Sequence, residues 1–428
     1  MRQERKVALL ALEDGSLFWG NSIGSAGETF GELVFNTSMS GYQEVLTDPS
    51  YFGQIVVMTY PEIGIYGVNA ADVESDAVQV AGYVVHRAVH IPFNQKATLA
   101  FPEYLRQAGV VALDGIDTRA LTRHLRTHGA MRGGIAVAED RAGLDPEALV
   151  ARVRQTPTIS GRDLAQHVTS RGFSPRDRAG ERPHIVLVDA GHKNGMLRNL
   201  SACGAAVTVV PYDAQPAAVL ALDPDGVLIS NGPGDPEPLA SAVVLIRALL
   251  KARVPVAGIC LGHQLLGLAL GGRTYKMQFG HRGVNHPVKD LESGSILITS
   301  QNHGFGVDPT SLGIAWMPLD AAFEPADPTV SLPDVASTST TMAEQLPSAP
   351  LVGVSPEGFG AVEVTHLSLN DGTVEGLKLR DCPAFSVQFH PEASPGPHDA
   401  RGFFSQFLAL VTAHTASGSS SAKGIDHA

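Results

Sequence analysis

Cys260 stands in the segment GICLG (258–262), between an apolar run and a Leu/Ala-rich run. The preceding run, VPVAGI, is typical of a buried strand, and the following one has helical spacing. A sharp strand-to-helix turn would push the thiol out above the edge of a sheet, and flanking glycines would remove Cβ atoms that clash there. The positive end of the helix would favour a thiolate. We therefore predict that Cys260 is a nucleophile in a strained backbone conformation, often of positive φ; the alternative is a buried apolar cysteine in a turn.

A thiolate nucleophile needs a base, and His390 has the most suggestive spacing of the sixteen histidines. It is followed by Pro391 and Glu392, and residues i and i+2 of an extended chain project from the same face. A carboxylate in that place would orient the imidazole and stabilise its charged form. The pattern predicts a Cys–His–Glu triad, although a solvated His–Glu pair at a strand end is an open alternative.

The loop SNGPGDP (230–236) directly follows the apolar run GVLIS. Ligands of open α/β sheets bind at the carboxyl ends of the strands, where this loop would lie. Gly232 and Gly234 would allow backbone N–H groups to face a developing oxyanion. An ordinary connecting loop is the alternative. The sequence has neither G-x-G-x-x-G at this loop nor a P-loop motif, so we do not expect it to bind a nucleotide.

The bulk composition indicates a globular protein of two or three domains, with 428 residues, 44% of them hydrophobic, and a net charge of −12. The absence of a long basic run argues against nucleic acid or anionic membranes as partners. The N-terminus lacks the apolar core of an export signal, and no apolar run reaches about 20 residues. Three cysteines at unrelated spacings predict neither disulfides nor a zinc site. We expect a cytoplasmic protein that holds no metal.

The chain divides into regions with different patterns. Residues 1–145 alternate short strand-like runs with loops and contain one clear helix, which Asp117 caps and Gly129 closes. Residues 146–183 are polar and predict a linker. From residue 184 strands alternate with helices, which indicates a parallel α/β sheet, and after about residue 286 the pattern is strand-rich. We expect a surface insertion at 309–350 and a disordered tail at 414–428.

Together these motifs resemble class I glutamine amidotransferases. Longer stretches resemble the small, glutaminase subunit of carbamoyl phosphate synthetase; they are FNTSMSGYQEVLTDPSY (35–51), GICLGHQLL (258–266), QNHGF (301–305) and HPEASPGPHD (390–399). The first lies outside the amidotransferase region and separates this subunit from other amidotransferases. The resemblance implies a flavodoxin-like amidotransferase domain at 184–413, preceded by a smaller mixed β/α docking domain at 1–145.

The resemblance also implies roles for individual residues. Cys260 would attack the side-chain amide of glutamine, His390 would move the proton, and Glu392 would orient His390. The N–H groups of Leu261 and Gly234 would form the oxyanion hole. The positions that match the family's glutamine-binding residues are Ser50, Gly232, Gln264, Asn302, Gly304 and Phe305.

The same resemblance implies a large subunit as partner, which would carry ATP and magnesium and receive the ammonia for carbamoyl phosphate synthesis, in arginine and pyrimidine biosynthesis. No cofactor is expected in this chain. Two other functions stay open: an amidotransferase subunit that serves another synthase, and a docking or regulatory subunit without catalytic activity. The 309–350 insertion follows QNHGF, so its influence on the site or on docking is open as well.

Overall fold

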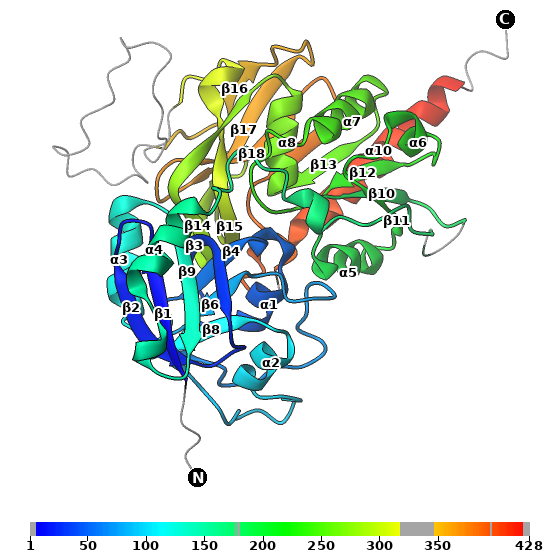
Figure 1. Ribbon diagram of the computed structural model, residues 1–428. Coiled ribbons are helices and arrows are strands. Elements are labelled where there is room, and N and C mark those ends of the chain that lie inside the picture. The colour runs from blue at the N-terminus through cyan, green and yellow to red at the C-terminus, as the bar shows by residue number, and fades with distance from the viewer. Residues whose placement is uncertain (1–5, 176, 178–179, 317–345, 394–395, 423–428) are drawn as a thin grey trace, which may run out of the picture.

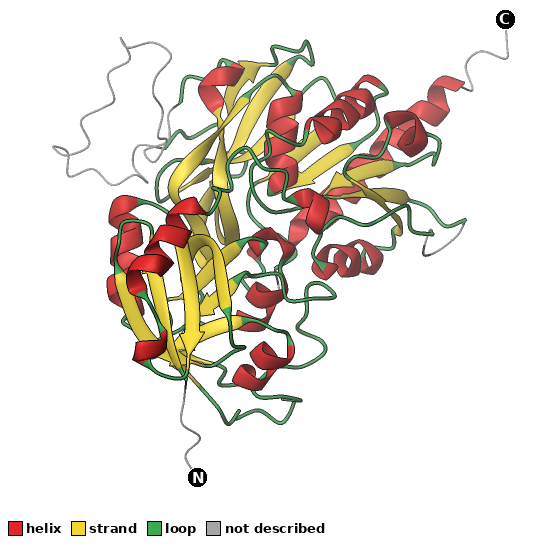
Figure 2. Ribbon diagram, in the orientation of Figure 1, coloured by secondary structure: helices red, strands yellow, loops and turns green. Residues whose placement is uncertain are grey.

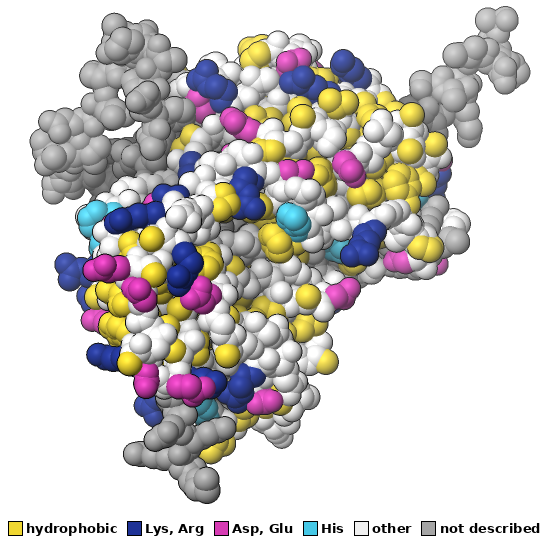
Figure 3. Space-filling view, in the orientation of Figure 1, with side chains coloured by type: hydrophobic (Ala, Val, Ile, Leu, Met, Phe, Trp, Pro, Cys, Tyr) yellow, Lys and Arg dark blue, Asp and Glu magenta, His cyan; other side chains and the backbone are white. Residues whose placement is uncertain are grey.

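The computed structural model describes residues 6–175, 177, 180–316, 346–393 and 396–422. Two bodies pack side by side, an N-terminal barrel and a larger layered α/β domain (Figure 1). Lys and Arg side chains are interspersed with Asp and Glu over the face in Figure 3, without a large patch of one sign. Among the described residues, no helix combines the length and the apolar character that crossing a membrane requires.

The N-terminal domain is a closed barrel with strand order β1-β2-β8-β6-β4-β3-β9. Closure removes the unpaired sheet edges that would otherwise template aggregation. The barrel strands are β1 (Val7–Leu12), β2 (Leu17–Ser22), β3 (Glu28–Asn36), β4 (Gln54–Met58), β6 (Gly82–Val84), β8 (Val111–Asp114) and β9 (Met131–Ala138), and β5 (Glu62–Ile63) pairs with β7 (Arg87–Ala88) outside it.

The helices of this domain are α1 (Tyr42–Thr47), α2 (Phe101–Gln107), α3 (Thr118–His128) and α4 (Pro146–Gln155), with 3₁₀ turns at Pro49–Tyr51, Arg141–Gly143 and Ala165–His167. The predicted helix is α3: the Asp117 side chain accepts the Ala120 N–H at 2.9 Å, and Gly129 ends the helix with φ 89°. Both capping residues therefore have the predicted roles.

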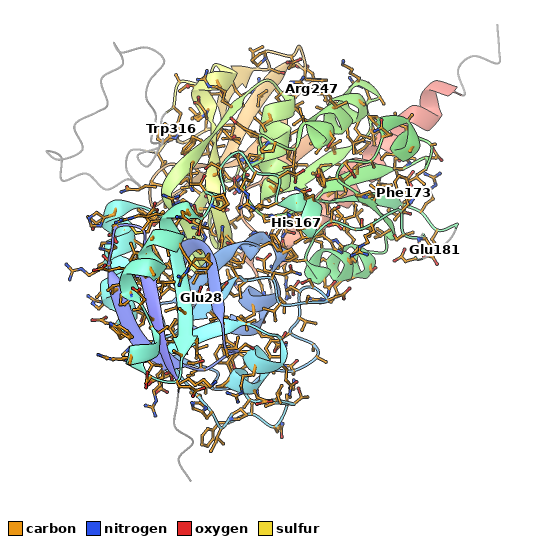
Figure 4. All side chains as sticks on the ribbon, viewed as in Figure 1. Glu28, His167, Phe173, Glu181, Arg247 and Trp316 are labelled. Carbon is orange, nitrogen blue, oxygen red and sulfur yellow. The ribbon has the colours of Figure 1, made fainter. Side chains whose placement is uncertain are left out.

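The predicted linker is corrected by the structure. Its first part folds as α4, whose Leu149 and Val153 are buried against Leu9, Ala11 and Ala136 of the barrel. The amphipathic face of this helix was overlooked because polar residues dominate the segment. The rest of the linker region touches both domains: the His167 ring stacks on Phe52 of the barrel with centroids 5.1 Å apart, and the Gly161 N–H donates to Asp235 Oδ2 of the second domain at 2.8 Å. Figure 4 shows His167 at the junction between the two domains.

The second domain is built on a ten-stranded mixed sheet of order β11-β10-β12-β13-β19-β18-β17-β14-β15, with β16 paired to β17. The first five of these strands are parallel and have the flavodoxin-like order 2-1-3-4-5, so the predicted fold class is confirmed. The strands are β10 (His184–Asp189), β11 (Ala206–Pro211), β12 (Gly226–Ile229), β13 (Val256–Ile259), β14 (Arg273–Asp290), β15 (Ile296–Asp308), β16 (Leu351–Val354), β17 (Ala361–Ser368), β18 (Val374–Leu379) and β19 (Ala384–Val387).

Helices cover both faces of the parallel part of the sheet, which explains why its strands are apolar throughout (Figure 2). One face packs against α7 (Ala240–Lys251) and α8 (Leu261–Ala269), and the other against α5 (Asn194–Ala202) and α10 (Gly402–Ala422). The remaining elements are α6 (Pro216–Leu220) and the 3₁₀ turns Pro309–Leu312 and Asp399–Arg401.

Two further boundaries are corrected. Helix α10 continues to Ala422, so the expected disordered tail is wrong for the backbone of 414–422. The expected insertion begins too early, because Leu312 and Ile314 are buried in the core of the second domain. Residues 317–345 of that insertion lie outside the described residues.

Candidate active site

Cys260 lies at the bend between β13 and α8, with φ 53° and ψ −102°. The prediction of a positive-φ cysteine immediately before a helix is confirmed. A Cβ atom on Gly258 would lie 2.6 Å from Gly262 O, and one on Gly262 would lie 2.3 Å from Ile229 O. Both glycines are therefore required by the close approach of β12, β13 and α8, as the spacing suggested. The thiol is 2% exposed, and its Sγ lies 3.6 Å from Asn302 O.

His390 and Glu392 lie just beyond the end of β19, the strand next to β13. His390 Nδ1 and Glu392 Oε1 are 2.6 Å apart, and both side chains are buried. The carboxylate fixes which ring nitrogen carries the proton, so Nε2 is left for another partner. This Nε2 is buried and has no hydrogen-bond partner among the described residues.

A buried lysine completes the charge arrangement. Lys193 Nζ lies 3.3 Å from Glu392 Oε1, and the two side chains are 8% and 0% exposed. Burial raises the pKa of Glu392, but Lys193 and His390 outweigh it and lower this pKa to about 2. Burial lowers the pKa of His390, but the charges of Glu392 and Cys260 raise it to about 10. The site therefore stabilises an ionised Glu392 beside a protonated His390.

Cys260 opens onto a cavity of about 20 Å³, which is room for a single water. The predicted glutamine-binding residues all line this cavity with Cys260, and so does Gly234 of the predicted oxyanion hole, whereas Leu261 does not. The lining residues come from both domains and include Ser50, Gly232, Gly234, Gln264, Asn302, Gly304 and Phe305. A substrate larger than water therefore requires the walls to move.

The barrel contributes Ser50 and Gln54 to the lining of this cavity, and Asp48 holds both Ser50 and Asn302 by hydrogen bonds. The Asn302 side-chain amide donates to Asp48 Oδ2 at 2.9 Å, and the Asn231 amide donates to Ser50 Oγ at 2.8 Å. Asp48 also accepts the backbone N–H of Ser50 at 2.9 Å. This buried network joins the two domains across the cavity, so Ser50 reaches the site as predicted.

The residues proposed for the oxyanion hole lie around Cys260. Leu261 is the first residue of α8, so its backbone N–H has no acceptor within the helix. Gly234 has φ 81°, a conformation that favours glycine. A Cβ atom on Gly232 would lie 2.2 Å from Ala190 O, so only glycine fits there.

Gln264 and Phe305 also line the cavity, and a hydrogen bond joins them. The Gln264 side-chain amide donates to Phe305 O at 2.8 Å and to Gln388 Oε1 at 3.1 Å. Gly304 directly precedes Phe305 in β15, and a Cβ atom on it would lie 3.0 Å from an Arg282 guanidinium nitrogen. These contacts fix the wall that would face a bound amide.

Sequence reasoning missed Lys193, Asp48 and Ile159. Asp48 belongs to the matching stretch 35–51, which does not mark it as a site residue, and Lys193 belongs to none of the motifs. Ile159, in the predicted linker, is 3% exposed and packs with Leu164 and Phe305 over the cavity. An apolar residue in a polar segment was the one available signal for Ile159; no local pattern marked the other two as site residues.

Comparison with known proteins gives two family matches. Residues 10–135 match the family described as "Carbamoyl-phosphate synthase small chain, CPSase domain". Residues 186–328 and 351–410 match "Glutamine amidotransferase class-I". The gap at 329–350 falls within the predicted insertion.

Curated relatives match over nearly the whole chain. The carbamoyl phosphate synthase small chain of Thermotoga maritima is 57% identical over 410 residues, which cover 95% of this chain and 98% of the relative. The proteins of the same name from Aquifex aeolicus and Methanopyrus kandleri are 46% and 44% identical, and each match covers 95% of this chain and 99% of the relative. With an amidotransferase domain joined to the matching N-terminal barrel, this chain belongs to the carbamoyl phosphate synthase small chain family.

Proposed function

We propose that this chain hydrolyses glutamine at Cys260 and passes the ammonia to a second subunit. The observation that carries the proposal is the strained Cys260 at the N-terminus of α8, close to the buried His390–Glu392 pair. The helix N-terminus and a protonated His390 both favour a thiolate. A thiolate is the form of cysteine that attacks a carbonyl carbon.

In the proposed first half-reaction, Cys260 Sγ attacks the side-chain carbonyl carbon of glutamine. The carbonyl oxygen takes up negative charge, which the N–H groups of Leu261 and Gly234 stabilise. His390 gives its proton to the departing nitrogen, the C–N bond breaks, and ammonia leaves. The product on the enzyme is a γ-glutamyl thioester.

In the second half-reaction, His390 accepts a proton from water while the water oxygen attacks the thioester carbon. The C–S bond then breaks, which releases glutamate and regenerates the thiolate beside protonated His390. Glu392 holds the ring through Nδ1 in both steps, and Lys193 keeps Glu392 ionised. The chemistry needs no cofactor in this chain.

The partner we propose is the large subunit of carbamoyl phosphate synthase, in the cytoplasm. The names of the relatives and the match of residues 10–135 support it. The large subunit would hold ATP and magnesium and capture the ammonia. A synthase of another kind is disfavoured by the match of the barrel, which lies outside the amidotransferase domain.

Cys260→Ser tests the catalytic proposal. It changes one atom, so the fold should be retained while glutamine hydrolysis is lost, and ammonia-dependent carbamoyl phosphate synthesis by the complex should continue. His390→Asn should lower hydrolysis by about 10²–10⁴-fold. Loss of ammonia-dependent synthesis in Cys260→Ser would assign the thiol a structural role. Glutamate release that is equal in both variants and the wild type would mean that the chemistry lies elsewhere.

Docking of the barrel is tested by hydrogen exchange on the assembled complex. A deletion of residues 1–140 is not a suitable test, because it would also remove Asp48 and Ser50 from the site. A loss of activity could then come either from lost docking or from a damaged site. Adding the large subunit should slow amide exchange on barrel strands and helices, and it should raise the rate of glutamine hydrolysis when ATP is used. Protection confined to the second domain would show that this domain carries the interface.

A further inference from the structure

Three buried side chains meet next to Asn302, and one of them, His303, also lines the cavity at Cys260. His281 on β14 and His303 on β15 are direct cross-strand partners, and Glu375 lies on β18. One ligand atom from each of the three residues lies within 4.8 Å of the others. We call these three residues the His–His–Glu cluster. None of the predicted catalytic residues belongs to it.

The free atoms of the cluster face one another. His281 Nδ1, His303 Nε2 and Glu375 Oε1 are buried and have no hydrogen-bond partner among the described residues. Glu375 Oε1 lies 3.5 Å from His281 Nδ1 and 3.9 Å from His303 Nε2. Three buried polar atoms without partners are costly unless something else satisfies them.

The opposite side of each cluster residue is held by a hydrogen bond. His281 Nε2 lies 2.7 Å from Asp371 Oδ2, and His303 Nδ1 lies 2.9 Å from Phe305 O. Glu375 Oε2 accepts from the Gln301 amide at 2.8 Å. Metal-binding histidines characteristically donate their second N–H to a carboxylate or a backbone carbonyl, which leaves the other nitrogen for the ion.

We propose that the His–His–Glu cluster binds one zinc ion. Imidazole nitrogen and carboxylate oxygen are zinc ligands at about 2.0–2.1 Å, which places ligand atoms about 3.3 Å apart in a tetrahedron. The two separations from Glu375 Oε1 exceed this by less than 1 Å, and the two ring nitrogens lie within 4.8 Å of each other, so rotation of the side chains must bring the three atoms closer together. A water molecule would supply the fourth ligand.

The surroundings suggest a route for the ion and a consequence. His281 and Asp371 also line a cavity of about 1190 Å³ between the barrel and the second domain. An ion could enter from this side without passing Cys260. Once bound it would join β14, β15 and β18 beside Asn302, and His303 lines the cavity at Cys260, so we expect the ion to stabilise the wall of the glutamine site. This proposal differs from the expectation that the protein holds no metal; the three ligands are 22 and 72 residues apart along the chain and form no local motif.

The alternative to a bound zinc ion is a second proton on His281. Burial lowers the pKa of His281, but Asp371 and Glu375 raise it to about 10. A protonated His281 could therefore link the two carboxylates without any metal. Measurement of the bound metal separates the two states.

The test uses the purified full chain, stripped with a chelator and titrated with Zn²⁺ and with Co²⁺. We expect one equivalent of either ion, a rise in melting temperature, and the visible absorption of tetrahedral Co²⁺. Glu375→Gln should weaken Co²⁺ binding by about 100-fold or more, and Asp371→Asn by about 10–100-fold. The matched control is His192→Gln, which breaks the His192–Asp189 pair (Nδ1–Oδ1 2.9 Å) away from the cluster and should leave binding unchanged.

Anomalous diffraction at the zinc edge from wild-type crystals gives a second readout that does not depend on how the variants fold. A peak between His281, His303 and Glu375 is the expected result. Failure of the wild-type chain to take up a stoichiometric ion would overturn the proposal and assign the cluster to the proton. Equal Co²⁺ affinity in Glu375→Gln and the wild type would overturn it too.

Discussion

Because the backbone of Cys260 is strained, we predict that Cys260→Gly is more stable than Cys260→Ala, which is the reverse of the usual order. At φ 53° and ψ −102°, a residue with a Cβ atom is held in a sparsely populated region of backbone space. Such strain costs about 1–3 kcal/mol. Glycine does not bear this cost, whereas alanine does. The comparison of Cys260→Gly with Cys260→Ala therefore isolates the strain, since both variants lack the thiol.

The expected difference follows from two opposing effects. Glycine loses more freedom on folding than alanine, which costs about 0.5–1 kcal/mol. Relief of strain exceeds this, so Cys260→Gly should be more stable than Cys260→Ala by about 1 kcal/mol, or about 2–4 °C in melting temperature for a domain of this size. At an ordinary helical position the order is the reverse.

Scanning calorimetry of the two variants is the assay, with Ala248→Gly in α7 as the control. Ala248 lies within an unstrained helix, so this control should lose about 1 kcal/mol. If Cys260→Gly is the less stable of the two Cys260 variants, as a glycine in a helix would be, the position stores no strain and the elbow argument fails. Both Cys260 variants should lack glutamine hydrolysis in either case.

Three further predictions concern the charges and the walls of the site. Lys193→Met removes the cation from a buried ion pair and should lower the free energy of unfolding in urea by about 3 kcal/mol. The control Lys6→Met breaks an ion pair whose side chains are 46% and 80% exposed, and it should cost at most about 1 kcal/mol. Equal costs would refute a structural role for the buried pair. Glu392→Gln should cost the most stability between about pH 4.5 and 6.5. The lowered pKa of Glu392 gives stabilisation that is complete above its ordinary 4.5 and lost as pH falls through about 2, and the raised pKa of His390 gives stabilisation that is complete below its ordinary 6.5 and lost as pH rises through about 10. A difference in stability that does not change with pH would contradict this. Ile159→Ala should raise KM for glutamine more than it lowers kcat, because Ile159 covers the cavity without touching the reacting groups, and a fall in kcat alone would place it in the chemistry.

The local elements of the site could be predicted from sequence because their causes are local. The turn at Cys260 requires two glycines four positions apart, and the His390–Glu392 pair follows from a spacing of two. The capping of α3 by Asp117 is equally local. The wrong boundaries have an equally clear reason. Mostly polar residues surround α4, so it is the packing of Leu149 and Val153 against the barrel that decides this helix, and the end of α10 consists mostly of small or polar residues.

The sequence by itself determined the bend at Cys260, the His390–Glu392 pair and the parallel sheet that presents them, since periodicity and short motifs encode these features. Only the tertiary structure decided which distant groups surround them. Lys193 meets Glu392 because both β10 and β19 end at the same edge of the sheet, and Asp48 meets Asn302 because the barrel packs against that edge. His281 faces His303 through the register of β14 against β15. Sheet order and register are set by the packing of whole layers, so no local stretch of residues specifies these meetings.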